Sequence, residues 1–470
     1  MEAIINFIYA FDNLCWDYAF PVLLIGSGIF FTILFKGKYL FNIKQIVQNS
    51  IGYSLKKNSD GQGTVSAFNA AMTNLGNTVG TGNISGVASA IAAGGPGAVF
   101  WMWVISAVCA VVKSTEIILG LRYRVRKDGE VYGNRDFIMG SVMGWRIPAA
   151  IFAFLAVITQ PLNAIVQTSS IVSALDEAFG FNKTATMLVV IGLLFIIIMG
   201  GLKRISGFAN KAVPTMCALY LILGIAIIII NFRAIPTAFA SVFRYAFTPK
   251  AGAGGALGYT VMQAFRYGSA RGLYSTDSGI GAAMCTYAAS ETDHPGRQAC
   301  WGLTENFIDT FIVCTITTLA ILTTGVYETG ETGAALATIA FGEVFGVAGK
   351  AFLAIATAIF AFTTLTATFY QNTISLNYLT RNLTNRKIEK VIMISWTLYF
   401  CLPQFLGTLD ADFLWAVADA SGVFNIICTI AILFALRKEA VNVCRDFFER
   451  YLPAYERGEN PDPVNYITDI

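Results

Sequence analysis

The stretch NLGNTVGTGNISG, Asn74–Gly86, decides how this chain folds. It lies inside an apolar run, Thr64–Ala93, that is long enough to cross a bilayer at about 20 residues per crossing. Glycine weakens a helix by about 1 kcal/mol, and the stretch holds a cluster of them at Gly76, Gly80, Gly82 and Gly86. A break frees backbone N–H and C=O groups, which membranes tolerate only where protein or a wet cavity satisfies them. The stretch therefore predicts a discontinuous membrane helix whose exposed backbone binds something small and polar.

The composition indicates an integral membrane protein. Hydrophobic residues make up 55% and charged residues 13% of the chain, whereas about 25% of a soluble domain is charged. The net charge of +3 does not indicate a nucleic-acid partner. The acidic start, MEAIINFIYAFDNL, is unlike a signal peptide. The nine cysteines lack CxxC spacing and His294 is the single histidine, so we expect no metal site built on histidine and no enzyme activity.

The hydropathy pattern predicts eleven transmembrane helices. The seventh contains a second cluster of glycine and hydroxyl residues around Asp277 and is predicted to be broken as well. The expected helices are Asn13–Phe35, Thr64–Ala93, Gly97–Leu121, Pro148–Ala174, Ala185–Leu202, Phe208–Ile230, Ala256–Ser290, Arg297–Thr324, Lys350–Leu379, Ile388–Leu406 and Phe413–Leu436.

Basic residues predict the orientation of these helices. Nineteen lysines and arginines fall in the loops on one side of the predicted membrane and five on the other, and basic loops face the cytoplasm. The N-terminus is therefore expected outside and the C-terminus inside. The two broken helices are five spans apart and start from opposite sides, which predicts two inverted repeats meeting at a midplane site. The predicted segments are an N-terminal helix and cytoplasmic loop (1–60), a first repeat (61–232), an extracellular connector (233–255), a second repeat (256–436) and a cytoplasmic tail (437–470).

Five motifs occur in a characteristic order. VGTGNISGVASAI at Val79–Ile91 and GGPGAVFWMW at Gly94–Trp103 are the most specific. RGLYSTDSGIG at Arg271–Gly281, HPGRQA at His294–Ala299 and FAFTT at Phe360–Thr364 add support. Together they resemble the alanine/glycine:cation symporter family, also called the sodium:alanine symporters. The resemblance implies an all-α membrane protein of the amino acid-polyamine-organocation superfamily, with a leucine-transporter-type 5+5 inverted repeat and one extra N-terminal helix.

The resemblance also implies a function. It is symport of sodium with a small neutral amino acid, alanine or glycine, into the cell by alternating access. The expected partners are that amino acid, sodium and the lipid bilayer, with the chain as a monomer in the cell membrane. Sodium prefers hard oxygen ligands, and the resemblance implies that threonine hydroxyls face carbonyls of the first broken helix. The residues of this implied sodium site are Thr73, Gly76, Thr363 and Thr364. The alternative for Thr363 and Thr364 is a hydrogen bond from each hydroxyl back to the i−4 carbonyl of its own helix.

An amino-acid zwitterion needs donors for its carboxylate and acceptors for its ammonium. The half-helix that begins after Thr78–Asn83 offers free N–H groups and a positive dipole end. Acceptor carbonyls are expected near Gly76 and within Phe265–Gly268, with Phe265 as a lid. Close helix packing is the alternative explanation for the glycines. The substrate-binding candidates are Asn77, Thr78, Gly80, Thr81, Gly82, Asn83, Gln167, Phe265 and Ser269.

Charged residues inside membrane helices are candidates for gating or coupling. Arg271 is expected to pair with Glu116 or Asp277, either as a gate or as a permanent structural pair. Asp277 or Glu305 could instead carry a proton, so proton coupling stays open. The candidates for gating or coupling are Glu116, Arg271, Asp277 and Glu305. Three further charged residues, Arg266, Asp309 and Asp419, are also expected inside membrane helices. Asp309 is four residues after Glu305 and is expected on the same helix face.

Four positions depart from the family's pattern and bear on the substrate. Thr276 and Asp277 stand where the family has Asn-Glu, Tyr287 replaces a histidine, and an aromatic residue near Thr368 is absent. The missing aromatic residue predicts a larger pocket, so a larger amino acid is an alternative substrate. TVGTG at Thr78–Gly82 resembles a potassium filter, but it occurs once and inside a full span, which argues against a channel. A non-transporting membrane sensor on the same fold is the last alternative.

Overall fold

The computed structural model describes residues 2–55, 63–127, 130–199, 201–248, 260–380, 386–459, 461–464 and 466–469. This described part is largely helical. The predicted segment boundaries at residues 60/61 and 255/256 lie outside it. The first helices are α1 (Glu2–Leu14), α2 (Phe20–Leu34), α3 (Lys38–Phe41), α4 (Ile43–Val47), α5 (Ala67–Thr78), α6 (Val87–Gly94), α7 (Ala98–Arg122), α8 (Arg135–Phe137), α9 (Arg146–Asn163), α10 (Ile165–Phe179), α11 (Lys183–Ile198) and α12 (Gly201–Ile230).

The second half of the chain repeats this helical character. Its helices are α13 (Ile235–Phe247), α14 (Val261–Thr276), α15 (Ala282–Ala288), α16 (Pro295–Gln298), α17 (Trp301–Asn306), α18 (Thr315–Thr324), α19 (Gly333–Thr380), α20 (Arg386–Cys401), α21 (Ala411–Ala435), α22 (Arg437–Asp446) and α23 (Leu452–Glu456). The short strands are β1 (Val65–Ser66), β2 (Val125–Lys127), β3 (Glu130–Tyr132), β4 (Ser290–Glu291) and β5 (Thr468–Asp469). The π-helical turns are Cys15–Ala19, Gln48–Gly52, Gly82–Gly86, Ile138–Val142, Phe307–Cys314 and Phe447–Tyr451, and the 3₁₀ turns are Phe232–Ala234, Val326–Glu328 and Leu402–Thr408.

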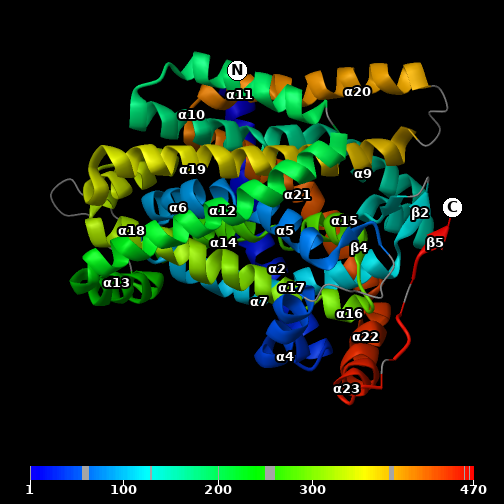
Figure 1. Cartoon of the computed structure of the whole chain (residues 1–470). Coiled ribbons are helices and arrows are strands. Elements are labelled where there is room, and N and C mark those ends of the chain that lie inside the picture. Colours follow the sequence, from blue (N-terminus) through cyan, green and yellow to red (C-terminus); the bar gives the residue numbers. More distant parts are fainter. Residues whose placement is uncertain are drawn as a thin grey trace.

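Most of the long helices run in a common direction (Figure 1). The helix α19 crosses the middle of the molecule, with α11 and α20 on one side of it and α7 and α14 on the other (Figure 1). α13 lies at one end of these helices, and β2 and β5 lie at the opposite end (Figure 1). Among the described residues, six segments are long and apolar enough to cross a membrane, or seven if the pair Thr215–Ile230 and Phe232–Phe247, bent by 76°, counts as one. The chain is therefore a multi-pass membrane protein.

The first predicted break is confirmed. α5 begins at an N-cap, where the Ser66 hydroxyl accepts the N–H of Asn69. It ends at Thr78, and Val79 has the non-helical angles φ −74° and ψ 89°. A π-helical turn, Gly82–Gly86, then leads into α6. The glycine cluster thus interrupts the helix at the middle of its apolar run, as the sequence predicts.

The second break is also present, but it lies later than predicted. α14 begins with a capping box in which Thr260 and Gln263 bond each other's backbone N–H groups. The helix continues through Phe265–Gly268 and ends at Thr276, so the prediction that half-helix carbonyls are free at Phe265–Gly268 is wrong. Asp277, Gly279 and Gly281 have positive φ and form the break before α15.

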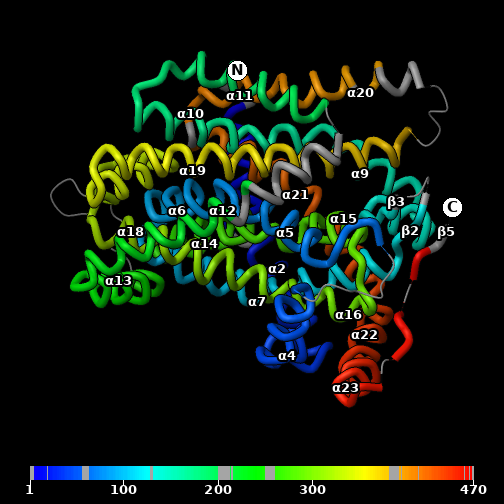
Figure 2. The backbone as a smooth tube through the Cα atoms, in the orientation of Figure 1, coloured from blue at the N-terminus to red at the C-terminus, as the bar shows by residue number. Residues whose placement is uncertain are grey.

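Short strands and the chain's last helices close one end of the molecule. β1, just before α5, pairs in parallel with β4, which follows α15, so both broken helices are joined there. β2 pairs with β3 and with β5 near the C-terminus. Figure 2 shows α22 and α23 beside α16 at this same end. The ends of the two broken helices therefore lie together at this end of the molecule, near the C-terminal helices.

Candidate functional site

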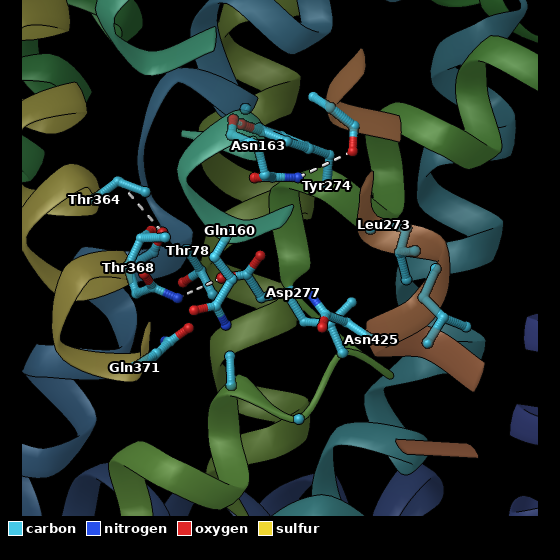
Figure 3. Close-up of a pocket in the computed structure, with 18 of the residues that line it drawn as sticks. Thr78, Gln160, Asn163, Leu273, Tyr274, Asp277, Thr364, Thr368, Gln371 and Asn425 are labelled. Atoms are coloured by element: carbon cyan, nitrogen blue, oxygen red, sulfur yellow. Dashed lines mark hydrogen bonds between the residues drawn. The ribbon is translucent and has the colours of Figure 1, made fainter. Parts of the chain in front are cut away.

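A cavity of about 90 Å³ lies between the two broken helices, α9, α10, α19 and α21. One water occupies about 10–15 Å³ on the same measure, so the space can hold several waters or a small organic molecule. It extends from the first break to α8. Seven of the sequence-predicted site residues line it: Asn77, Thr78, Gly80, Gly82, Gln167, Asp277 and Thr364. Figure 3 shows Thr78, Asp277 and Thr364 around this space.

Two threonines of α19 face the carbonyls that the first break frees. The hydroxyl of Thr363 lies 3.4 Å from the Gly76 carbonyl oxygen. The hydroxyl of Thr364 lies 3.4 Å from the same oxygen and 3.3 Å from the Asn77 carbonyl oxygen. These are long distances for O–H···O bonds, whose usual length is about 2.7–2.8 Å. The structure thus brings these two threonines next to the end of α5. Both hydroxyls also donate to the Phe360 carbonyl oxygen of their own helix, at 2.8 Å from Thr363 and 3.2 Å from Thr364. Thr73 donates its hydroxyl to Asn69 of its own helix at 2.7 Å.

The remaining polar groups of the first break are tied to each other and to α10. The side chain of Asn83 accepts the N–H of Gly80 at 2.9 Å, so the break is capped from within. The Thr81 hydroxyl donates to Gln167 Oε1 at 2.7 Å, and Gln167 Nε2 donates to the hydroxyl of Tyr274 at 3.3 Å. Gln167 therefore connects the first break to α14. Thr81 is outside the cavity lining, but its hydroxyl bonds Gln167, which is part of it.

Buried charged side chains satisfy the backbone of the second break. Lys113 donates to the Thr276 carbonyl oxygen at 3.0 Å, and Arg135 Nη1 donates to the Ile280 carbonyl oxygen at 2.6 Å. The carboxylate of Glu116 accepts the N–H of Gly279. Each freed group named here is thus held by a charge-assisted hydrogen bond, the stronger kind.

Asp277 connects the two breaks. It has a left-handed backbone with φ 51° and lines the cavity, and Asn77 Nδ2 donates to its carboxylate at 2.5 Å. The Oδ1 atom of Asn77 is buried and has no hydrogen-bond partner among the described residues. An acceptor without a partner, next to a carboxylate, suits an ammonium group in the cavity.

Glu305 and Asp309 face different partners. Glu305 forms a buried ion pair with Lys113 at 2.8 Å, accepts Asn74 Nδ2 at 2.8 Å and also accepts the hydroxyl of Tyr287. Asp309 lies in the π-helical turn Phe307–Cys314, which rotates it toward Asn83 Nδ2 at 2.6 Å and Ser275 Oγ at 2.5 Å. The spacing of four residues predicts a shared face only for a regular α-helix, which this segment is not.

The structure corrects the expected partners of Arg271. Its Nη1 atom bonds both carboxylate oxygens of Asp419 at 2.7 and 2.8 Å, and its guanidinium lies 3.9 Å from the centre of the Trp415 ring. The predicted pairing of Arg271 with Glu116 or Asp277 is therefore wrong. Because α21 supplies both Asp419 and Trp415, the contact ties the second broken helix to α21 instead.

Four predicted substrate residues do not line the cavity: Thr81 and Asn83, whose bonds are given above, and Phe265 and Ser269. Phe265 lies near the start of α14 and packs edge-on against Trp101 with ring centres 4.9 Å apart. Ser269 is buried, and its hydroxyl has no partner among the described residues. Neither Phe265 nor Ser269 supports the lid or the side-chain bond expected of it.

Sequence reasoning missed three residues at or near the cavity. Lys113 is fully buried in α7, and its charge inside an apolar helix was a usable signal. Gln160 of α9 and Gln371 of α19 line the cavity (Figure 3), and Gln371 lies seven residues after Thr364, on the same face of a helix. That spacing was visible in the sequence, but only once Thr364 was placed.

The comparisons with known proteins identify the family of this chain. The model of the sodium:alanine symporter family matches residues 1–461. The chain belongs to this family. A protein of Methanococcus maripaludis named sodium/alanine symporter AgcS is 31% identical over 88% of this chain and 91% of its own. A sodium/proton-dependent alanine carrier protein of a Bacillus species is 36% identical over 85% of this chain and 90% of its own.

A third relative is named for a different substrate, glutamine. The Bacillus subtilis protein "Probable sodium/glutamine symporter GlnT" is 30% identical over 99% of this chain and 94% of its own. Among solved structures, the manganese transporter of Eremococcus coleocola superposes with a TM-score of 0.51 at 12% identity, covering 86% of this chain and 92% of that one. At this identity the likeness concerns the fold, which is that of a membrane transporter.

Proposed function

We propose that this family member couples inward sodium movement to the uptake of a small neutral amino acid by alternating access. Alanine and glycine are the substrates to test first, because relatives are named for alanine. The observation that carries the proposal is the oxygen set formed by Gly76, Asn77, Thr363 and Thr364 beside the cavity. Oxygens that ligate one hard cation at about 2.3–2.6 Å lie roughly 3–4 Å apart, as these hydroxyls and carbonyls do.

The substrate would lie next to this cation. Its carboxylate would face the start of the half-helix at Gly82–Gly86, where backbone N–H groups and the helix dipole favour an anion. Its ammonium would face the carboxylate of Asp277 and the unpartnered Oδ1 of Asn77. Thr78 and Gln167 complete this part of the lining.

The transmembrane organisation is also part of the proposal. Four further segments complete the seven spans counted above: the two broken helices α5–α6 and α14–α15, with α11 and α20. This makes eleven, with inverted repeats at 61–232 and 256–436 and the N-terminus outside. In that orientation the cavity, which extends to Arg135 and Asp136 of α8, faces the cytoplasm. The structure then corresponds to an inward-facing state.

The coupling ion is sodium rather than a proton in this proposal. Of the two acidic candidates for carrying a proton, Glu305 is paired with Lys113 and lies outside the cavity lining. Asp277 is the acidic group left to test, because its carboxylate lies beside the cavity and its bond comes from a neutral amide.

The test is uptake of radiolabelled alanine into proteoliposomes under imposed sodium and pH gradients. We expect sodium-driven uptake in the parent protein. Thr364→Ala should raise the half-saturating sodium concentration by about 10–100-fold, the cost seen when groups that support a metal site are removed. The matched control is Thr366→Ala. Thr366 is also buried on α19, but its hydroxyl donates at 2.8 Å to the Thr363 carbonyl oxygen of its own helix, whereas the Thr364 hydroxyl also faces the α5 carbonyls.

Two outcomes would contradict the sodium assignment. One is equal sodium dependence in Thr364→Ala and Thr366→Ala. The other is uptake that ignores sodium and follows the proton gradient, in which case Asp277→Asn is the next variant to measure.

A further inference from the structure

Two glutamines in the cavity have polar atoms that lack hydrogen-bond partners. The Oε1 atom of Gln160 and the Nε2 atom of Gln371 are both buried, and neither finds a partner among the described residues. Both side chains line the cavity, and Figure 3 shows Gln371 projecting from α19 and Gln160 from α9. Buried polar atoms in proteins are nearly always satisfied, so this acceptor and this donor indicate a missing ligand or water.

The position of these atoms relates them to the proposed substrate site. Thr364, Thr368 and Gln371 follow one another on one face of α19, and all three line the cavity. Gln371 lies about 10 Å along the helix from Thr364, at 1.5 Å per residue. Side chains on a helix lean toward its N-terminus, so the amide of Gln371 reaches back toward Thr368 and the first break. The unpartnered atoms of Gln160 and Gln371 are thus placed to contact the side chain of a bound amino acid rather than its carboxylate or ammonium group.

Thr368 leaves room for that side chain. It separates Thr364 from Gln371 on the cavity face of α19, and its small side chain leaves the path between them open. Gln160 is only 7% exposed, so an apolar group placed against its Oε1 would leave this acceptor unsatisfied in a dry site. A ligand group that both accepts and donates avoids this cost.

We propose that Gln160 and Gln371 form a subsite for a side-chain carboxamide, so that the chain carries neutral amino acids of the asparagine and glutamine class. The substrate amide would donate its N–H to Gln160 Oε1 and accept Gln371 Nε2–H with its carbonyl oxygen. Alanine would leave both groups to water, so we expect it to be carried less well than an amino acid whose carboxamide bonds them. This inference rests on the proposed function, amino-acid symport, and narrows its substrate.

The first experiment compares substrates in the parent protein. Sodium-driven uptake of labelled alanine is competed with unlabelled glutamine, asparagine, glutamate and methionine, and uptake of labelled glutamine is measured directly. We expect glutamine or asparagine to compete at least about tenfold more strongly than methionine, which has similar length but no amide, and than glutamate, which lacks the N–H. Sodium-driven alanine uptake without competition or transport of either carboxamide would overturn this inference and leave the proposed function standing. The absence of sodium-driven uptake of any amino acid would overturn both.

The second experiment substitutes Gln371 and, as a control, a glutamine outside the cavity. Gln263→Glu keeps the capping box of α14 and lies outside the cavity lining, so the ratio of glutamine to alanine uptake should change by less than about threefold. Gln371→Glu replaces the donor with an acceptor, so that ratio should fall at least about tenfold. Gel filtration of the purified variants verifies that both fold. Equal ratios in the two variants would show that Gln371 does not bond a substrate carboxamide and would overturn the assignment.

Discussion

The two broken helices solve the same backbone problem in opposite ways. Among the described residues, the side chains that bond the freed carbonyls of Gly76 and Asn77 at the first break are neutral threonine hydroxyls, at 3.3–3.4 Å. At the second break the freed groups of Thr276 and Ile280 are bonded by Lys113 and Arg135 at 3.0 and 2.6 Å. Hydrogen bonds from ionised groups are roughly twice as strong as neutral ones.

This difference separates a binding break from an anchoring break. Carbonyls with long hydrogen bonds from neutral hydroxyls can bind a cation without breaking a strong bond. Carbonyls bonded to buried ammonium or guanidinium groups would first have to give up a strong bond. Gly279 adds to the contrast, because its N–H is taken by the carboxylate of Glu116. We infer that ligands enter and leave at the first break, while the second holds its shape and meets the first through Asp277 and Asn77.

Removing the anchoring charge should have the largest effect. Lys113→Met leaves Glu305 buried without a counter-charge and frees the Thr276 carbonyl. Breaking a buried ion pair by removing one partner costs about 3–5 kcal/mol, a large part of a stability of about 5–15 kcal/mol. We expect a strongly lowered melting temperature and little folded protein after purification in detergent.

A double variant serves as the control for Lys113. Lys113→Met with Glu305→Gln removes both charges and should recover much of the lost stability. If Lys113→Met alone melts like the parent protein, the second break is not held by this pair and the contrast between the breaks fails.

A methyl group at the first break should stop transport and leave the fold intact. The Cβ atom of Gly80→Ala would lie 2.5 Å from the Thr364 hydroxyl oxygen, so that hydroxyl must turn away from the α5 carbonyls. We expect uptake to fall at least about tenfold, equivalent to 1.4 kcal/mol of binding, with an unchanged melting temperature. Gly422→Ala is the matched control, because Gly422 lines the same cavity and its Cβ would meet nothing within 4 Å. Similar uptake in both variants would mean that the first break does not bind the transported species.

Much of the fold and part of the site follow from local sequence. The clustered glycines predict the first break because helix weakening is a local effect, and the family resemblance predicts that Thr363 and Thr364 face it. The second break was misplaced because glycine has two uses. Gly268 packs closely against Ala98 and Trp101 of α7, and such contact stabilises the helix instead of interrupting it.

The partners of the buried charges were not predictable from local sequence. Arg271 meets Asp419 across 148 residues of chain, and the choice of Asp419 over Asp277 depends on how α21 packs. The unsatisfied amides of Gln160 and Gln371 are also a property of the packed cavity. Sequence therefore predicts which helices break, and tertiary packing decides which side chains fill each break.

The smallest effect is expected just after the second broken helix, where α22 of the C-terminal tail packs. His294 follows α15 and is fully buried. Its Nδ1 accepts the N–H of Gly296 at 2.9 Å, and its Nε2 lies 3.0 Å from the Asp446 carboxylate of α22. Both contacts are satisfied by the neutral ring, and burial lowers the pKa of His294 below its ordinary value of about 6.5. Hydrogen bonds from His294 and Arg450 lower the pKa of Asp446, so it stays charged at mildly acidic pH.

Acid should therefore loosen the tail. When α22 undocks, His294 recovers its ordinary pKa, so below about pH 6.5 the undocked state binds more protons and the docked state loses stability as pH falls. We expect hydrogen exchange in Arg437–Asp446 to be a few-fold faster at pH 5.5 than at pH 7.5, after correction for the intrinsic rate. His294→Asn can still cap Gly296 but does not titrate in this range, so it should remove the dependence. Equal corrected rates in the parent protein, or a dependence that survives in His294→Asn, would show that the second broken helix is not anchored through this histidine.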